Sequence, residues 1–90
     1  MKKSKYTFIC EYRKGTYISQ YKAENLDRAL HLWILNLTYP PLSTSEKRIL
    51  EWKINEPDWF PVAIKEIDNV WCSTFTIKRS FLLLNIIETV

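Results

Sequence analysis

The strongest constraint on the fold is an alternation of side-chain types that runs through residues 6–23 and is interrupted once, at Lys14 and Gly15. In residues 6–13 and again in residues 16–23, every second side chain is aromatic or small, which is the period of a strand with one buried face. Gly15 is the only glycine of the chain, and we expect it to supply the positive φ angle that a tight turn requires. The pattern predicts an antiparallel β-hairpin.

A helix is expected to follow the hairpin and to pack on it. Asn25 is a suitable N-cap because its side-chain oxygen can accept a backbone N–H of the first turn, and Asp27 is favourable near the positive end of the helix dipole. The apolar stripe of this helix consists of Leu26, Ala29, Leu30, Trp33 and Leu37. Three further apolar residues outside the stripe are Leu32, Ile34 and Leu35. The helix is therefore more apolar than one covered face requires, and Pro40 and Pro41 end it.

Ser43 and Glu46 have the spacing of a capping box, which predicts a second, short helix over residues 44–54. Because residues 48–54 also alternate in polarity, a strand at this position is an open alternative. A loop containing two prolines follows, and in it we expect Trp59 and Phe60 to tuck into the core.

The last third of the chain predicts three strands, over residues 62–67, 70–77 and 81–89. The turns between them are expected at residues 68–69 and at residues 78–80. The final strand is apolar on both faces, as strands in the centre of a sheet are.

The fold class predicted from these elements is α+β. We expect an antiparallel sheet of about five strands, with one long and one short helix mainly on one face, in the order β-β-α-α-β-β-β and in a single domain over residues 1–90. Two helices and one sheet do not obviously bury all of this apolar surface. A homodimer or a complex with another protein is therefore expected.

The composition is that of a chain that folds without covalent or metal cross-links. With 90 residues, of which 47% are hydrophobic, it can form a core without disulfides or metal ions. The basic start of the chain is followed by an alternating strand and not by an apolar signal sequence, and the longest apolar runs fall far short of the roughly 20 residues that span a bilayer. We expect a cytoplasmic protein that binds no membrane, with Cys10 and Cys72 as reduced core thiols.

Residues that could carry chemistry are sparse, and we assign no catalytic, cofactor-binding or metal-binding residue. His31 is the sole histidine and has no second ligand near it in the sequence, so a small enzyme or enzyme subunit that uses His31 is only the second alternative. One glycine is too few for a phosphate-binding loop or a dinucleotide fingerprint. The carboxylates of Glu11, Glu56, Asp58, Glu66 and Asp68 are expected to be solvated charges.

Nucleic-acid binding is the first alternative. The net charge is +3 and the sequence pI is about 8.9. Cationic residues occur at two of the three expected turns, the first and the last: Arg13, Lys14, Lys78 and Arg79. If the two turns share one end of the sheet, they form a basic rim for phosphates. Tyrosines at positions 12, 17 and 21 could stack bases beside it.

The preferred hypothesis is a non-enzymatic, small protein-binding module that acts by steric occlusion, as inhibitors, immunity proteins and antitoxins do. Its candidate anchors are Tyr17, Tyr21, Trp33 and Trp59. The hairpin and the helix that begins at Asn25 resemble the opening half of HicB-type antitoxins, whose hairpin also precedes a helix. The proline loop and the three C-terminal strands depart from that pattern, so the resemblance assigns no residue.

Overall fold

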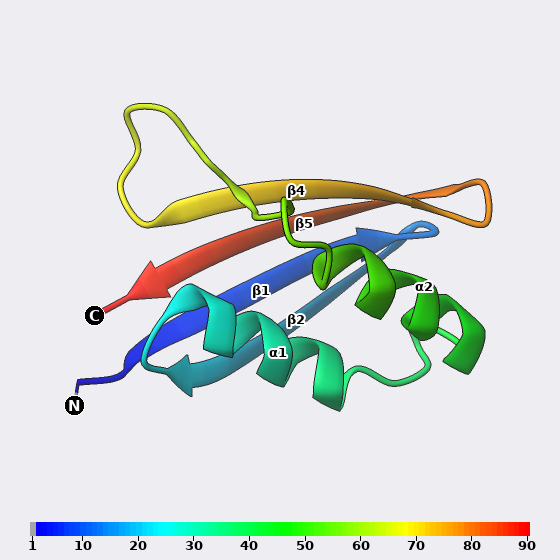
Figure 1. Ribbon diagram of the computed structural model, residues 1–90, viewed down its shortest axis with the longest axis horizontal. Coiled ribbons are helices and arrows are strands. Elements are labelled where there is room, and N and C mark those ends of the chain that lie inside the picture. Colours follow the sequence, from blue (N-terminus) through cyan, green and yellow to red (C-terminus); the bar gives the residue numbers. More distant parts are fainter. Residues whose placement is uncertain (1) are drawn as a thin grey trace.

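The computed structural model describes residues 2–90. Its elements are β1 (Ser4–Tyr12), β2 (Gly15–Ala23), α1 (Leu26–Asn36), α2 (Thr44–Ile54), β3 (Val62–Ala63), β4 (Val70–Ile77) and β5 (Ser80–Thr89). All strand pairs are antiparallel, and the strands form one sheet in the order β2-β1-β5-β4-β3. Both helices lie on the same side of this sheet (Figure 1). The predicted α+β class and element order are confirmed.

The turn of the first hairpin is built differently from our expectation. Arg13 and Lys14 are the two loop residues and have positive φ angles of 47° and 67°, whereas Gly15 already belongs to β2 and has no positive φ. Gly15 is needed for space, because a Cβ at this position would come within 2.5 Å of the Tyr17 hydroxyl oxygen. The glycine makes room for the Tyr17 ring, and two cationic residues take the left-handed conformation that the turn requires.

Helix α1 begins as predicted. The Asn25 side chain accepts a hydrogen bond from the Arg28 backbone N–H at 2.8 Å. The expected stripe is buried against the sheet, and Ile34 is buried with it. At the centre of the contact, the Trp33 ring stacks on Phe8 with 5.5 Å between ring centroids and 3° between planes. The helix thus covers the hairpin through a stacked aromatic pair.

Helix α2 confirms the capping box and excludes the strand alternative for its residues. The Ser43 hydroxyl accepts the Glu46 N–H, and the Glu46 carboxylate accepts the Ser43 N–H at 3.0 Å. The predicted difference in helix length is wrong, since both helices have 11 residues. Helix α1 is shorter than expected because Leu37 already takes an extended conformation, ahead of the two prolines.

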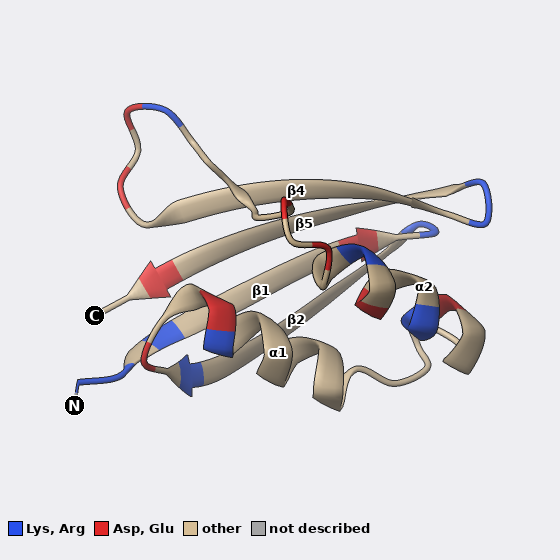
Figure 2. Cartoon of the chain, in the orientation of Figure 1, with Lys and Arg blue, Asp and Glu red and all other residues tan. Residues whose placement is uncertain are grey.

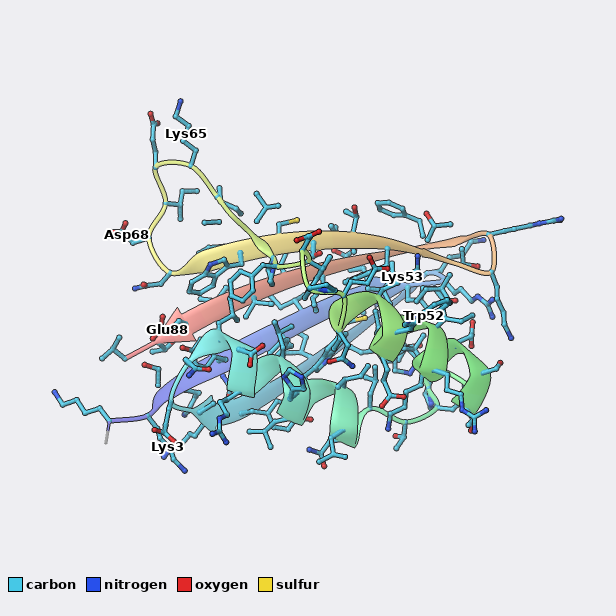
Figure 3. The ribbon with its side chains drawn as sticks, in the orientation of Figure 1. Lys3, Trp52, Lys53, Lys65, Asp68 and Glu88 are labelled. Atoms are coloured by element: carbon cyan, nitrogen blue, oxygen red, sulfur yellow. The ribbon has the colours of Figure 1, made fainter. Side chains whose placement is uncertain are left out.

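The strand expected over residues 62–67 is also wrong beyond its first two residues. The Ile64 N–H makes one further hydrogen bond to the Val70 carbonyl at 3.0 Å. The chain then turns, and Glu66 takes a φ of 67°, which a strand cannot accommodate. Residues 64–69 therefore form a loop that projects from the sheet, and Figure 3 shows Lys65 and Asp68 at its outer side.

The loop before β3 contains one of the two expected core anchors. Trp59 is partly buried and its ring lies 5.5 Å from that of Phe75. The prediction for Phe60 is wrong, because its side chain turns outward and is 53% exposed. Adjacent residues of an extended segment point in opposite directions, so only one of the pair reaches the core.

Strand β5 lies in the middle of the sheet, as predicted, and its two faces have different surroundings. Leu82, Leu84 and Ile86 are fully buried beneath the helices. On the opposite side, Phe81 is 61% exposed and Ile87 is also exposed. We call the helix side the covered face and the other side the open face. Within residues 2–90, no helix has both the length and the apolar character needed to cross a membrane.

Candidate functional site

The open face carries apolar side chains that no element of the described chain covers. They are Ile9, Ile18, Val62, Val70, Cys72, Phe81, Leu83 and Ile87. The register makes many of them neighbours, since Ile9 pairs with Ile18 and Val70 pairs with Ile87. The side chains therefore form a connected patch across all five strands.

Charges are nearly excluded from the open face. Thr7, Gln20, Thr74, Thr76 and Asn85 are the neutral polar residues between the apolar ones. Among the strand residues of this face, only Lys5, Glu11 and Lys22 are charged, and all three lie near strand ends. An apolar centre depleted in charge is typical of a protein interface. From strand spacing and length, the face measures roughly 600 Å², close to the ~800 Å² that each partner buries in a standard interface.

A second feature is the basic end, which we define as the two hairpin turns with Arg13, Lys14, Lys78 and Arg79. Figure 2 shows both turns in blue at the same end of the sheet. A hydrogen bond links them, since Arg13 Nε donates to Ser80 Oγ at 3.0 Å. The geometric condition for the predicted basic rim is met. What the rim binds stays a prediction.

The backbone of the basic end is unusual. All four cationic residues have positive φ angles, those of Lys78 and Arg79 being 48° and 69°. Asparagine and glycine are the usual residues in such two-residue turns, and a larger residue there costs on the order of 1 kcal/mol. Strained positions of this kind are concentrated at functional sites. The strain therefore favours a role for the charges.

A buried carboxylate holds one of these cations in place. Glu46 is 3% exposed; it accepts a 2.6 Å hydrogen bond from the Tyr12 hydroxyl and pairs with Arg13 Nη2 at 3.0 Å. The Tyr12 hydroxyl, the Ser43 amide and the Arg13 charge together lower the pKa of Glu46 to about 2. Among residues 2–90, neither Lys14 nor Arg79 forms an ion pair, so both remain available for a ligand.

The contact between Tyr12 and Glu46 corrects one expectation about Tyr12 and shows a role of Glu46 that the sequence did not predict. Tyr12 is 2% exposed, so the prediction that it could stack on bases is wrong: its ring belongs to the core and its hydroxyl to Glu46. The sequence identified Glu46 only as part of a capping box. No local spacing could reveal its contact with Tyr12, because the two residues are 34 positions apart.

The open face and the basic end are continuous. A hollow at their junction is lined by Arg13 and Lys14 from the first turn, by Glu11 and Thr16 beside it, and by Phe81 and Leu83 from β5. Apolar and cationic groups thus lie on one surface. Such a surface complements a partner that presents apolar side chains bordered by acidic groups.

The four predicted anchors all lie on the covered side of the sheet. Trp33 is 1% exposed, so a partner cannot contact it in this fold, and Trp59 packs on Phe75. Tyr21 lies edge-on against Phe8, with 6.0 Å between centroids. Tyr17 and Tyr21 are half-buried and line the free edge of β2, where they stay accessible from one side.

His31 lies half-exposed on α1 and is not a packed core residue. Its Nδ1 is 2.8 Å from the Asp27 carbonyl oxygen and its Nε2 is 3.3 Å from Asn55 Oδ1. The hydrogen bond to Asp27 raises the pKa of His31. Neither contact is a thiol or hydroxyl that the imidazole could activate. The described residues contain no group of three or more His, Cys, Asp or Glu able to hold a metal ion.

The two cysteines lie on opposite faces of the sheet. Both are free thiols, as predicted, but the prediction that both lie in the core is wrong for Cys72, which is only partly buried. Cys10 is fully buried on the covered face, and burial raises its pKa to about 12. Cys72 faces the other way and lines a surface hollow with Phe60, Val62 and Thr74. Each face of the sheet therefore carries one thiol, whose reactivity can report on the accessibility of that face.

Two sequence signals pointed to these surfaces: the second apolar face of the last strand, and the cationic pairs at both turns. Ile9 and Ile18 were not singled out, because a strand pattern alone does not say which of its faces the helices cover. Comparisons with protein-family models, with curated proteins and with solved structures found no match to the chain.

Proposed function

We propose that the chain is a non-enzymatic protein-binding module of the cytoplasm that blocks a partner by covering it with the open face. The observation that carries this proposal is the apolar patch across the open face, on which Ile18 is 66% and Phe81 61% exposed. The largest exposed apolar patch of a soluble domain is often a functional surface. Inhibitors, immunity proteins and antitoxins act in this way.

The chemistry of the surface defines the partner. The centre of the open face is uncharged and mostly apolar, with Asn85 between Ile9 and Cys72, so it suits apolar side chains that lose water on contact. The adjoining basic end offers Lys14 and Arg79, whose charges attract an acidic surface and accelerate association. The partner is therefore a protein with an apolar patch bordered by aspartate or glutamate. Binding occludes that patch and needs no chemical step.

The test uses Thr74→Glu. Thr74 is exposed on the open face and pairs with Leu83 in the register, so the new carboxylate places a charge at the apolar centre and repels an acidic rim. Lys65→Gln is the matched control, because it also lowers the net charge by one and lies on the projecting loop (Figure 3). A partner is captured from native lysate with the wild-type protein, purified, and its Kd measured for all three proteins.

We expect Thr74→Glu to weaken the purified complex at least tenfold and Lys65→Gln to leave it within a factor of about two. A complex in which Thr74→Glu binds as tightly as the wild-type protein contradicts the proposal. The proposal is also contradicted if every protein that the wild-type chain retains from the lysate is retained equally by Thr74→Glu.

Nucleic-acid binding is the second candidate, and the basic end favours it specifically. Four cations in strained backbone at one end of a sheet form a compact site for phosphates. If this account is correct, labelled RNA or DNA is shifted by the wild-type protein in low salt, and the double variant Lys14→Glu with Arg79→Glu abolishes the shift. Thr74→Glu then has little effect, which separates this candidate from the first.

A further inference from the structure

Strand β2 is an edge of the sheet, with no strand beside its outer side in the described chain. It has nine residues, pairs with β1 without a bulge, and contains no proline. Residues 15–21 carry no charge. Folded proteins usually protect such an edge with charges, proline or a bulge, because the free backbone groups can pair with another strand. The other edge, β3, has only two residues.

The hairpin geometry shows which backbone groups are free. A two-residue turn makes Tyr12 and Gly15 a hydrogen-bonded pair. Because such pairs alternate with pairs that are not hydrogen-bonded, the N–H and C=O groups of Thr16, Ile18, Gln20 and Lys22 point away from β1. They form a ladder ready for a further antiparallel strand.

An apolar strip runs beside this ladder on both faces of the sheet. On the covered side, Tyr17 and Tyr21 are half-buried, and α1 adds Leu32 and Leu35, the latter 70% exposed. Leu32 and Leu35 line a hollow next to the end of β2, and Figure 1 shows α1 lying over this strand. On the open side, Ile18 is largely exposed. The strip contains Leu32 and Leu35, two of the three apolar residues of α1 outside the predicted stripe; the third, Ile34, is buried in the core.

We propose that β2 pairs with β2 of a second copy of the chain, so that two five-stranded sheets become one continuous antiparallel sheet. Centred on Ser19, this pairing uses the whole strand and sets Tyr17 opposite Tyr21 of the second copy. The two α1 helices then lie side by side, and each covers Leu35 of the other. Backbone hydrogen bonds and apolar contacts act together.

Charge selects both the occupant and the register. In the register centred on Ser19, Lys14 of one copy comes opposite Glu24 of the other, just beyond the ends of β2. Moving the centre to Ile18 would set Lys14 opposite Lys22, which is unfavourable. The strand is thus complementary to itself in the one register that uses its full length.

The contact has the size of a modest dimer interface. Nine residues extend for about 30 Å, and together with the helix layer they bury roughly 1,000 Å² in total, near the lower limit for a specific interface. The two-fold axis is perpendicular to the sheet, so both open faces stay on the same side and remain free. The inference does not rest on the proposed function of the open face.

The test is Ile18→Pro, measured by light scattering on the eluting protein over a range of concentrations. Proline removes an N–H that points away from β1, so the hairpin keeps its own hydrogen bonds. We expect the wild-type protein to approach twice 10.8 kDa at high micromolar concentration and Ile18→Pro to remain a monomer. Leu35→Lys leaves the backbone intact and should weaken the dimer at least tenfold, which keeps the test decisive if Ile18→Pro fails to fold.

Thr74→Glu is the control, because it lies on the fourth strand of the sheet order and should dimerise as the wild-type protein does. A monomeric wild-type protein at all concentrations overturns the inference, as does a dimer that survives Leu35→Lys unchanged. A dimer lost only in Thr74→Glu would assign the contact to the open face instead. Failure of the partner-binding proposal leaves these masses unaffected, so the two proposals fail separately.

Discussion

The two faces of the sheet are formed by alternate residues of the same strands, yet they differ in almost every physical property. On the covered face, Phe8, Cys10 and Leu84 are fully buried beneath the two helices. On the open face, Ile18 and Phe81 project from those strands into solvent. The difference comes from where α1 and α2 pack and not from the strands themselves. Apolar side chains on the covered face stabilise the fold, whereas those on the open face are exposed, and in our proposal they contact a partner.

The largest expected effect is a contrast between one aromatic residue from each face. Trp33→Ala removes a buried ring stacked on Phe8 and should lower the free energy of unfolding by about 3–5 kcal/mol. Phe81→Ala removes an exposed ring and should lower it by less than about 1 kcal/mol. Urea denaturation of the monomer measures both values. Equal losses for the two variants would show that the faces are not energetically different.

If Trp33→Ala does not fold, Trp33→Phe preserves the test. It keeps an aromatic ring against Phe8 and should cost roughly 1–3 kcal/mol, still more than Phe81→Ala. A loss smaller than that of Phe81→Ala would contradict the contrast between the faces.

The next largest effect concerns the buried carboxylate beneath the basic end. Folding lowers the pKa of Glu46 from 4.5 to about 2, so the stability that it provides is complete above pH 4.5 and is lost as the pH falls toward 2. Glu46→Gln should therefore cost roughly 2–3 kcal/mol at pH 7 and very little at pH 2. The measurement is the free energy of unfolding of both proteins across this pH range.

Glu11→Gln supplies the comparison from the open face. Glu11 is an exposed carboxylate, and its replacement should change stability by no more than about 0.5 kcal/mol at any pH. A constant deficit for Glu46→Gln from pH 7 to pH 2 would mean that its carboxylate is not the group that titrates.

A smaller effect, of opposite sign, is expected at the turns. Arg79 has a φ of 69°, so Arg79→Gly should raise stability by about 0.5–1 kcal/mol because glycine adopts this conformation without strain. The same change should weaken association with an acidic partner or a nucleic acid. Arg79→Lys retains the charge and the strain and should do neither. Thermal unfolding measures the change in stability, and binding titrations measure the change in affinity. If Arg79→Gly gains stability without losing any binding, the strained backbone at this turn does not serve binding.

Much of the fold could be predicted because its signals are local. The alternation of residues 6–23, the Asn25 cap and the capping box of Ser43 with Glu46 each depend on neighbours within one turn or one strand, and all are confirmed. The strand over residues 62–67 could not be judged in this way. Its apolar pattern suits a strand, but pairing with β4 ends at Ile64 because the chain turns at Glu66.

The candidate site was predicted less well because it depends on contacts between distant residues. Alternation shows that a strand has an apolar face and does not show which face the helices cover. Gly15 seemed to serve the turn, whereas its missing side chain gives space to Tyr17. Two tryptophans and two tyrosines were natural candidates for anchors of a partner. Aromatic residues fill a core as readily as an interface, however, and Trp33 lies in the core.

The most direct test of the account compares the two thiols, one on each face of the sheet. In the free protein, a thiol-specific alkylating reagent should modify Cys72 on the open face, while Cys10 should react only after unfolding because it is buried and its pKa is raised to about 12. When the captured partner is bound, Cys72 should be protected from the reagent. An unchanged rate of Cys72 modification in the complex would contradict the claim that the open face is the binding surface.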